Sequence, residues 1–188
     1  MSGNAAPANL VLIGLMGAGK STTGLRLAKR LGRPFIDTDA QVEVDTGKTI
    51  AEIFAQDGED GFRRAEAETV SRICQQRGQV IAVGGGTVLN KANTAVLRKN
   101  GTIFWLDVEP DILVGRMGSR VSRAHRPLLA DATSADELHR RVNDLRDARD
   151  EAYRSAAHHI IRVDGGQSGE AVITEILRII GHRPPKHP

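Results

Sequence analysis

The segment GLMGAGKS, residues 14–21, has the residue types and spacing of a loop that binds a phosphate chain. It fits the pattern G-x-x-x-x-G-K-[ST], follows the apolar run LVLI and precedes a segment with helical spacing of apolar residues. Its glycines let backbone N–H groups face phosphate oxygens, and the next helix directs its N-terminus at the anion. Lys20 is expected to reach the β- and γ-phosphates, and Ser21 to bind Mg²⁺. A simple glycine-rich turn is the alternative, and it accounts less well for the motif in this context.

Two aspartates, Asp37 and Asp39, follow the apolar pair Phe35 and Ile36 at the end of a predicted strand. Residues two apart in a strand point the same way, so both carboxylates are expected to face the crevice where open α/β sheets bind ligands. We expect this strand to lie beside the strand that leads into the phosphate loop. One carboxylate could then hold Mg²⁺ and the other could address an acceptor hydroxyl. The alternative is that Asp39 only caps a helix starting at Ala40.

Three further segments carry residues that could serve a ligand site. GFRRAEAE, residues 61–68, supplies arginines, although its spacing also fits a charged helix face with i,i+3 and i,i+4 pairs. VGGGT, residues 83–87, would let a ligand approach the backbone closely, although a loose turn fits equally well. RPLL, residues 126–129, lies in a polar, basic stretch, and an arginine there could stabilise charge on a transferring phosphoryl group. An exposed loop arginine is the alternative for that segment.

Short β-rich runs alternate with longer segments that have helical spacing of apolar residues. The predicted strands are residues 10–13, 34–37, 80–83, 102–106 and 160–163. Capping-box patterns mark helix starts at Thr49 with Glu52 and at Ser134 with Glu137, and Pro110 suits the first turn of another helix. Strands that alternate with helices predict an α/β fold with a parallel sheet covered on both faces.

The 188 residues have an ordinary soluble composition, with 40% hydrophobic and 26% charged residues and a net charge of +3. We expect a flexible tail at residues 1–9, a single domain at residues 10–181 with a lid at about residues 118–131, and a second tail at residues 182–188. No apolar run is long enough to span a membrane, and no signal peptide is evident. The single cysteine, Cys74, fits a reducing compartment, so we expect a cytoplasmic protein.

Four residues fit structural roles better than chemical ones. His158 and His159 adjoin a predicted strand, where neighbouring side chains face opposite ways, so they are not expected to share a metal ion. Cys74 is expected to be a buried thiol, and Trp105 is expected to lie in the core.

The ordered set GLMGAGKST, FIDTD, FRRAE, GGGT, RPLL and RDEAY resembles the shikimate kinase family. The phosphate loop alone is shared by many families, but the ordered set is much more specific, and it runs from about Leu10 to a helix ending near Ile180. The resemblance implies a P-loop kinase fold of the nucleoside-monophosphate-kinase type, with a five-stranded parallel sheet flanked by helices and a mobile lid. It also implies transfer of the γ-phosphoryl group of ATP, with Mg²⁺, to the 3-hydroxyl of shikimate, a step of chorismate and aromatic amino acid biosynthesis.

The resemblance assigns roles to individual residues. Asp37 and Ser21 match residues that hold Mg²⁺, and Asp39 matches an aspartate that binds shikimate hydroxyls and is the candidate base. The implied catalytic residues are Lys20, Asp39 and the lid arginine, Arg126, which reaches the ATP phosphates. The implied ATP-binding residues are Gly17, Ala18, Gly19, Lys20, Ser21, Thr22, Arg116, Arg126 and Gln167. The implied substrate-binding residues are Asp39, Arg63, Glu66, Gly85, Gly86 and Arg149.

Within the substrate set, Arg63 and Arg149 match residues that grip the carboxylate, and Glu66 matches one that positions the arginines. Gly85 and Gly86 match backbone contacts to the substrate. The sequence departs from the family pattern in three places. Glu151 stands where the family often has proline, the loop GGQSGE (165–170) lacks a proline that some members carry, and VSRAH (121–125) adds residues to the lid.

Two other functions fit parts of the pattern. Another small-metabolite kinase, such as a gluconate kinase, would share the phosphate loop and the strand-end aspartate, but Arg63, Arg149 and the GGG turn argue against it. A nucleotide-binding regulator or a nucleic-acid binder could use the arginines between residues 116 and 154, but acids lie among them and aromatic stacking positions are absent. We therefore expect shikimate and ATP as partners, no nucleic acid, no membrane and a monomer.

Overall fold

The computed structural model describes residues 8–117, 134–165 and 168–182. The strands are β1 (Asn9–Ile13), β2 (Phe35–Asp37), β3 (Val80–Ala82), β4 (Gly101–Val108) and β5 (His159–Val163). The helices are α1 (Lys20–Leu31), α2 (Thr38–Thr46), α3 (Ile50–Ile73), α4 (Lys91–Asn100), α5 (Pro110–Met117), α7 (Ala135–Ala156) and α8 (Gly169–Ile179), with a 3₁₀ turn η1 (Thr87–Leu89). The predicted lid at residues 118–131 lies outside the described residues, together with Arg126 and Gln167.

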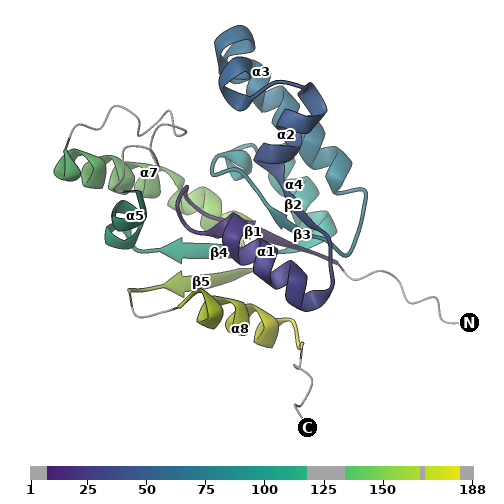
Figure 1. Cartoon of the computed structure of the whole chain (residues 1–188), viewed down its shortest axis with the longest axis vertical. Helices are drawn as coiled ribbons and strands as arrows, with labels where there is room; N and C mark the ends of the chain where they lie inside the picture. Colours follow the sequence, from purple (N-terminus) through teal and green to yellow (C-terminus); the bar gives the residue numbers. More distant parts are fainter. Residues whose placement is uncertain (1–7, 118–133, 166–167, 183–188) are drawn as a thin grey trace, which may run out of the picture.

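The strands form one sheet in the order β2-β3-β1-β4-β5, and every pair of neighbours is parallel (Figure 1). This confirms the predicted five-stranded parallel sheet. The prediction that the strand carrying Asp37 lies beside the phosphate-loop strand was wrong, because β3 lies between them. The burial of the strands gives the physical reason. All three residues of β3 are buried, as a strand with neighbours on both sides requires, whereas those of β2 are only partly buried and suit an edge.

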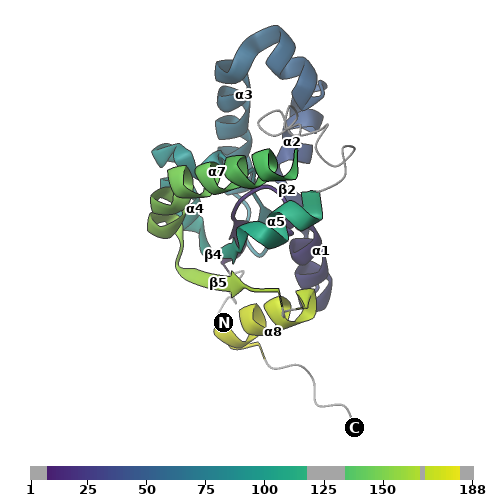
Figure 2. The ribbon, with the colours of Figure 1, turned by 90° about the vertical axis from the view of Figure 1, so that its left-hand side faces the viewer.

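Helices cover both faces of this sheet (Figures 1 and 2). On one face, α1 packs on β1, β2 and β3, and α8 packs on β5 and α1. On the other face, α4 and α7 pack on β4, and α3 packs on α4. The α2–α3 pair extends beyond the β2 edge of the sheet (Figure 1). The two-sided cover explains why β1 is buried along its whole length.

The main core is aliphatic and fills the space between the sheet and its helices. Trp105 is 2% exposed and stacks on Tyr153, and Cys74 is buried, so both predictions for these side chains are confirmed. Asn9 is also buried and starts β1, one residue earlier than the predicted domain boundary. His158 accepts a hydrogen bond from the Ile103 N–H at 3.0 Å. None of the helices within the described ranges is long and apolar enough to cross a membrane.

The predicted helix starts are present. Thr49 and Glu52 form the reciprocal capping box at the start of α3, and the Ser134 side chain accepts a hydrogen bond from the Glu137 N–H at the start of α7. α5 begins at Pro110.

The α2–α3 pair has a small hydrophobic cluster of its own, separate from the main core. Val42, Ile53 and Phe62 form its buried part. Within α3, Gly58 has φ 70° and ψ −174°, a combination that glycine adopts almost alone, and the helix breaks there. The break divides α3 into a short segment beside α2 and a longer one that returns to the main core.

Candidate active site

The phosphate loop connects β1 to α1, which is the context that its motif requires. Gly14, Gly17 and Gly19 all have positive φ angles, of 142°, 80° and 87°. A Cβ at Gly14 would lie 2.7 Å from the Leu106 carbonyl oxygen, so only glycine fits there. The Lys20 ammonium donates hydrogen bonds to the carbonyls of Gly14 (2.9 Å) and Leu15 (3.0 Å). The loop is thus folded around its own lysine.

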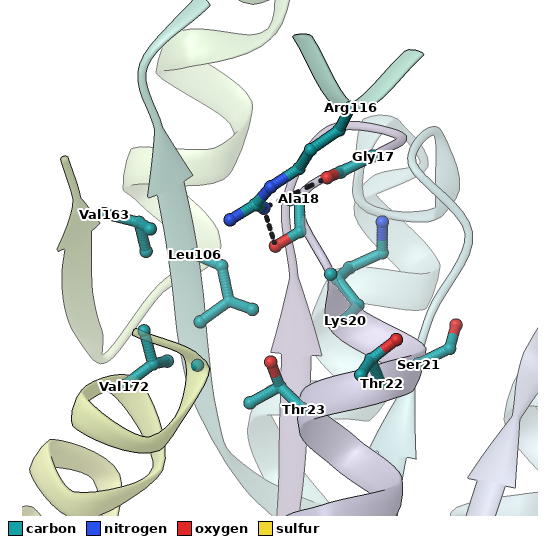
Figure 3. A pocket seen from close by; sticks show the side chains of 12 residues that line it. Gly17, Ala18, Lys20, Ser21, Thr22, Thr23, Leu106, Arg116, Val163 and Val172 are labelled. Carbon is teal, nitrogen blue, oxygen red and sulfur yellow. Dashed lines mark hydrogen bonds between the residues drawn. The ribbon is translucent and has the colours of Figure 1, made fainter. Parts of the chain in front are cut away.

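A cavity of about 430 Å³, here called the phosphate-loop cavity, opens above this loop (Figure 3). Its lining residues are Gly17, Ala18, Gly19, Lys20, Ser21, Thr22, Thr23, Leu106, Arg116, Val163, Gly169 and Val172. The Arg116 guanidinium donates to the carbonyls of Gly17 and Ala18, each at 3.3 Å. Figure 3 shows apolar side chains of β4, β5 and α8 on the side opposite Lys20. One wall therefore suits a planar apolar group and the other suits phosphates.

A second cavity of about 350 Å³, here called the arginine cavity, lies on the other side of the loop. Its lining residues are Met16, Gly17, Lys20, Ser21, Asp37, Asp39, Ile50, Phe54, Glu59, Phe62, Arg63, Glu66, Val83, Gly84, Gly85, Gly86 and Arg149. Gly17, Lys20 and Ser21 line both cavities. A group bound in one cavity would therefore meet a group bound in the other at Lys20.

Asp37 and Asp39 both line the arginine cavity, as predicted, but only Asp37 belongs to the strand. α2 begins at Thr38 rather than after Asp39, and its N-cap is Asp37, whose carboxylate accepts a hydrogen bond from the Asp39 N–H at 3.1 Å. The alternative that Asp39 caps a helix starting at Ala40 was thus wrong, because the helix starts two residues earlier and Asp37 is its cap. The other oxygen of Asp37 accepts a hydrogen bond from the Ser21 hydroxyl at 2.6 Å. Asp39 lies in the first turn of α2, and its carboxylate lines the arginine cavity.

Burial is the main cause that raises the pKa of Asp39 to about 6, and the negative charges of Asp37 and Glu66 raise it further. Lys20 and Arg63 act in the opposite direction. A carboxyl group with such a pKa is ionised near neutral pH and can still accept a proton, as a general base requires.

Arg63 lies among carboxylates on α3. Its NH1 donates to Glu66 at 3.0 Å, and its Nε and NH2 donate to a single oxygen of Glu59 at 3.3 and 3.1 Å. Glu66 is 1% exposed and also accepts a hydrogen bond from the Thr87 hydroxyl at 2.6 Å. Thr87 thus anchors Glu66, and Glu66 fixes the NH1 side of the guanidinium.

Arg149 reaches the GGG turn from α7. Its NH1 donates to the Gly85 carbonyl at 3.2 Å, and the Tyr153 hydroxyl donates to the same oxygen. Because Tyr153 is 1% exposed and stacked on Trp105, it ties the turn to the main core. All the predicted site residues within the described ranges therefore line one of the two cavities.

The family model for shikimate kinase matches residues 16–181. The chain belongs to the shikimate kinase family. The shikimate kinase of Symbiobacterium thermophilum is 48% identical over 176 residues, which are 93% of this chain and 97% of that relative. The shikimate kinase of Rhodopirellula baltica is 38% identical over 174 residues, covering 92% and 90% of the two chains.

Solved structures of the family have the same fold. Shikimate kinase from Acinetobacter baumannii in complex with shikimate superposes with a TM-score of 0.82 at 32% identity, over 94% of this chain and 95% of that one. Shikimate kinase from Bacteroides thetaiotaomicron also gives a TM-score of 0.82, at 30% identity, over 93% and 98% of the chains. The P-loop kinase fold expected from the sequence is thereby confirmed.

Sequence analysis missed several residues that support this site. Glu59 and Thr87 hold Arg63 and Glu66, and Phe54 and Phe62 stack on each other in the arginine cavity. Glu59 lies four residues before Arg63, so helical spacing could have found that pair. The pairing of Thr87 with Glu66 joins residues 21 positions apart and leaves no local signal.

Thr38 was also missed, although it lies between the two predicted aspartates. Its buried hydroxyl accepts a hydrogen bond from the Gly84 N–H at 3.0 Å, which ties α2 to the GGG turn.

Thr38→Val keeps the shape of the side chain but leaves the Gly84 N–H without an acceptor, and we expect a loss of about 1–3 kcal/mol in the free energy of unfolding. Urea denaturation measures it, and Thr38→Ser, which keeps the hydroxyl, should lose much less. Equal stability of the valine variant and the wild type would contradict the assignment.

Proposed function

We propose that the protein transfers the γ-phosphoryl group of ATP to the 3-hydroxyl of shikimate, with ATP in the phosphate-loop cavity and shikimate in the arginine cavity. The observation that carries this assignment is the wall shared by the two cavities at Gly17, Lys20 and Ser21. A phosphate chain along the loop would end where the second cavity begins. Phosphoryl transfer needs this juxtaposition more than it needs covalent chemistry from the protein.

The arginine cavity offers a matching group for each part of shikimate. Arg63 and Arg149 would bind its carboxylate, since guanidinium and carboxylate pair strongly. Asp39 would accept the proton of the shikimate 3-hydroxyl. At the same time the oxygen of that hydroxyl would form a bond to the γ-phosphorus of ATP, and the bond between this phosphorus and the leaving ADP would break. The Lys20 ammonium would stabilise negative charge on the transferring group. Arg126, outside the described residues, is proposed to close over the phosphates from the lid, and Gln167, also outside them, to lie near adenine.

Mg²⁺ fits the oxygens beside the loop. The Ser21 hydroxyl and the Asp37 carboxylate, 2.6 Å apart, are the hard oxygen ligands that Mg²⁺ prefers, and it completes its shell with water and phosphate. Within residues 8–117, 134–165 and 168–182, no three His, Cys, Asp or Glu side chains gather into a metal site. Ser21 and Asp37 would therefore hold the ion together with the nucleotide. When bound, it would neutralise charge on the phosphate oxygens.

We also propose that residues 10–181 form a single domain with a lid at about residues 118–131, and that the protein is a cytoplasmic monomer without nucleic-acid or membrane partners. The main core, which extends across the whole sheet, supports one domain. Light scattering after size-exclusion chromatography measures the oligomeric state, and a dimer mass would contradict the monomer.

The decisive assay measures ADP release from purified protein with ATP and Mg²⁺, with and without shikimate. Turnover should depend on shikimate, and the product should be shikimate 3-phosphate. Gluconate at the same concentration is the matched acceptor control. Release of ADP that does not respond to shikimate would contradict the proposal.

Arg63→Ala should raise the KM for shikimate about 10- to 100-fold, because it removes charge-assisted hydrogen bonds to the substrate carboxylate. The KM for ATP should change little. Arg64→Ala is the control, since Arg64 is the next residue, carries the same charge and is exposed. Arg63→Lys keeps a charge beside buried Glu66 and checks that the effect does not come from misfolding. An unchanged KM for shikimate in Arg63→Ala would remove Arg63 from the substrate site.

A further inference from the structure

The guanidinium of Arg63 has three edges that can meet a ligand, and each of them has a neighbour. NH1 donates to Glu66, and the edge formed by Nε and NH2 donates to Glu59. The third edge, between NH1 and NH2, faces Gly86, where a Cβ would lie 2.9 Å from both nitrogens. A substrate carboxylate that is to bind the Nε–NH2 edge of Arg63 side by side must therefore replace Glu59.

The two carboxylates that hold Arg63 differ in how firmly they are fixed. Glu66 is buried and accepts a hydrogen bond from Thr87. Its displacement from Arg63 would leave the buried charge of Glu66 without its ion-pair partner, which is costly. The Glu59 side chain is 67% exposed, and Arg63 is its only ion-pair partner among the described residues. An exposed ion pair of this kind contributes little free energy. Glu59 is therefore the neighbour that an incoming carboxylate can replace.

The backbone around Glu59 also favours this exchange. Glu59 directly follows Gly58, where α3 breaks, so it lies in the first turn of the second helical segment. A carboxylate near a helix N-terminus is stabilised by the helix dipole. Glu59 thus retains a favourable position after it leaves Arg63.

We propose that Glu59 occupies the place of the substrate carboxylate on Arg63 while no substrate is bound, and that it thereby sets the specificity of the arginine cavity for anionic acceptors. It pairs with the Nε–NH2 edge of Arg63 until a substrate carboxylate takes that edge. The inference rests on the proposed role of Arg63 in binding the carboxylate. An acceptor without a carboxylate leaves the Glu59–Arg63 pair in place and gains nothing from Arg63.

The test measures the dissociation constants of shikimate and of its methyl ester by calorimetry. Glu59→Gln should bind shikimate about two- to fivefold more tightly than the wild type, the range that an exposed ion pair supports. Its affinity for the uncharged methyl ester should stay the same. Asp60→Asn is the matched control, because it also removes one negative charge, and Asp60 is exposed and forms no ion pair among the described residues. It should leave both affinities unchanged.

Three results would overturn the inference. Weaker or unchanged binding of shikimate by Glu59→Gln would mean that Glu59 orients Arg63 or has no role in binding. An equal gain for the methyl ester, or for Asp60→Asn, would mean a general effect of charge. Arg63→Ala separates this failure from failure of the proposed function. If Arg63→Ala weakens shikimate binding while Glu59→Gln does not strengthen it, only the role of Glu59 is wrong.

Discussion

Asp39→Asn is expected to lower kcat for shikimate phosphorylation by about 10²- to 10⁴-fold, the range that a general base contributes. Asparagine keeps the size of the side chain and can still hydrogen bond to a substrate hydroxyl, but it cannot take up the proton. The dissociation constant of ATP should change little, since Asp39 lines only the arginine cavity. Coupled assays at saturating shikimate measure kcat, and calorimetry measures ATP binding. Retained turnover would leave Asp39 with a role in binding alone.

The raised pKa of Asp39 adds a second readout to this variant. Its carboxyl has a pKa of about 6 in the folded protein, above its ordinary value of 3.8, so the folded state binds the proton more tightly than the unfolded state. The wild type therefore loses stability as pH rises from about 4 to 6, and the full cost is present above pH 6. At pH 7.5, Asp39→Asn should melt about 3–8 °C higher than the wild type, and the difference should shrink toward pH 4. In the wild type, kcat/KM should fall as pH drops through about 6.

Lys20→Met should lower kcat by about 10²- to 10³-fold, comparable to removal of one group that stabilises transition-state charge. The ammonium lies at the wall between the two cavities and now bonds to the carbonyls of Gly14 and Leu15. Methionine has a similar length but no charge and no donor. We also expect ATP to bind more weakly, because the phosphates lose their cation.

Lys29→Met is the control for this experiment. Lys29 lies in the last turn of the same helix, is exposed, and lies outside both cavities. It should keep wild-type kcat and ATP affinity. If Lys20→Met also retained wild-type kcat, the phosphate chain would have to lie elsewhere.

Sequence patterns predicted where the helices and strands lie along the chain better than they predicted which of these elements are neighbours in the fold. Periodicity, the P-loop motif and the capping patterns were sufficient for the strands, the loop and the starts of α3, α5 and α7, because these depend on nearby residues. Strand order depends on which strand is most completely buried, and the burial of β3 between β2 and β1 arises only when the whole sheet is assembled. Likewise, Asp37 caps α2 because the helix begins one residue after it, and a shift of two residues in this helix boundary moved the capping role from Asp39 to Asp37.

Residues that contact across the fold were harder to predict than residues that carry the motif. Arg63, Glu66 and Arg149 were named through the family resemblance, and the structure brings them to one cavity. Thr38 and Thr87 hold the GGG turn and Glu66 through hydroxyl groups. A single threonine has no periodicity or charge pattern, so only the three-dimensional structure reveals such contacts.

Asp37 lines the arginine cavity and contacts Ser21, which lines both cavities. One of its oxygens accepts from Ser21 beside the phosphate loop, and the other accepts from the Asp39 N–H at the start of α2. A nucleotide that moves Asp37 therefore also moves the turn that carries Asp39. Thermodynamic linkage makes any resulting cooperativity between the two substrates reciprocal, so the factor by which ATP changes shikimate affinity equals the factor by which shikimate changes ATP affinity.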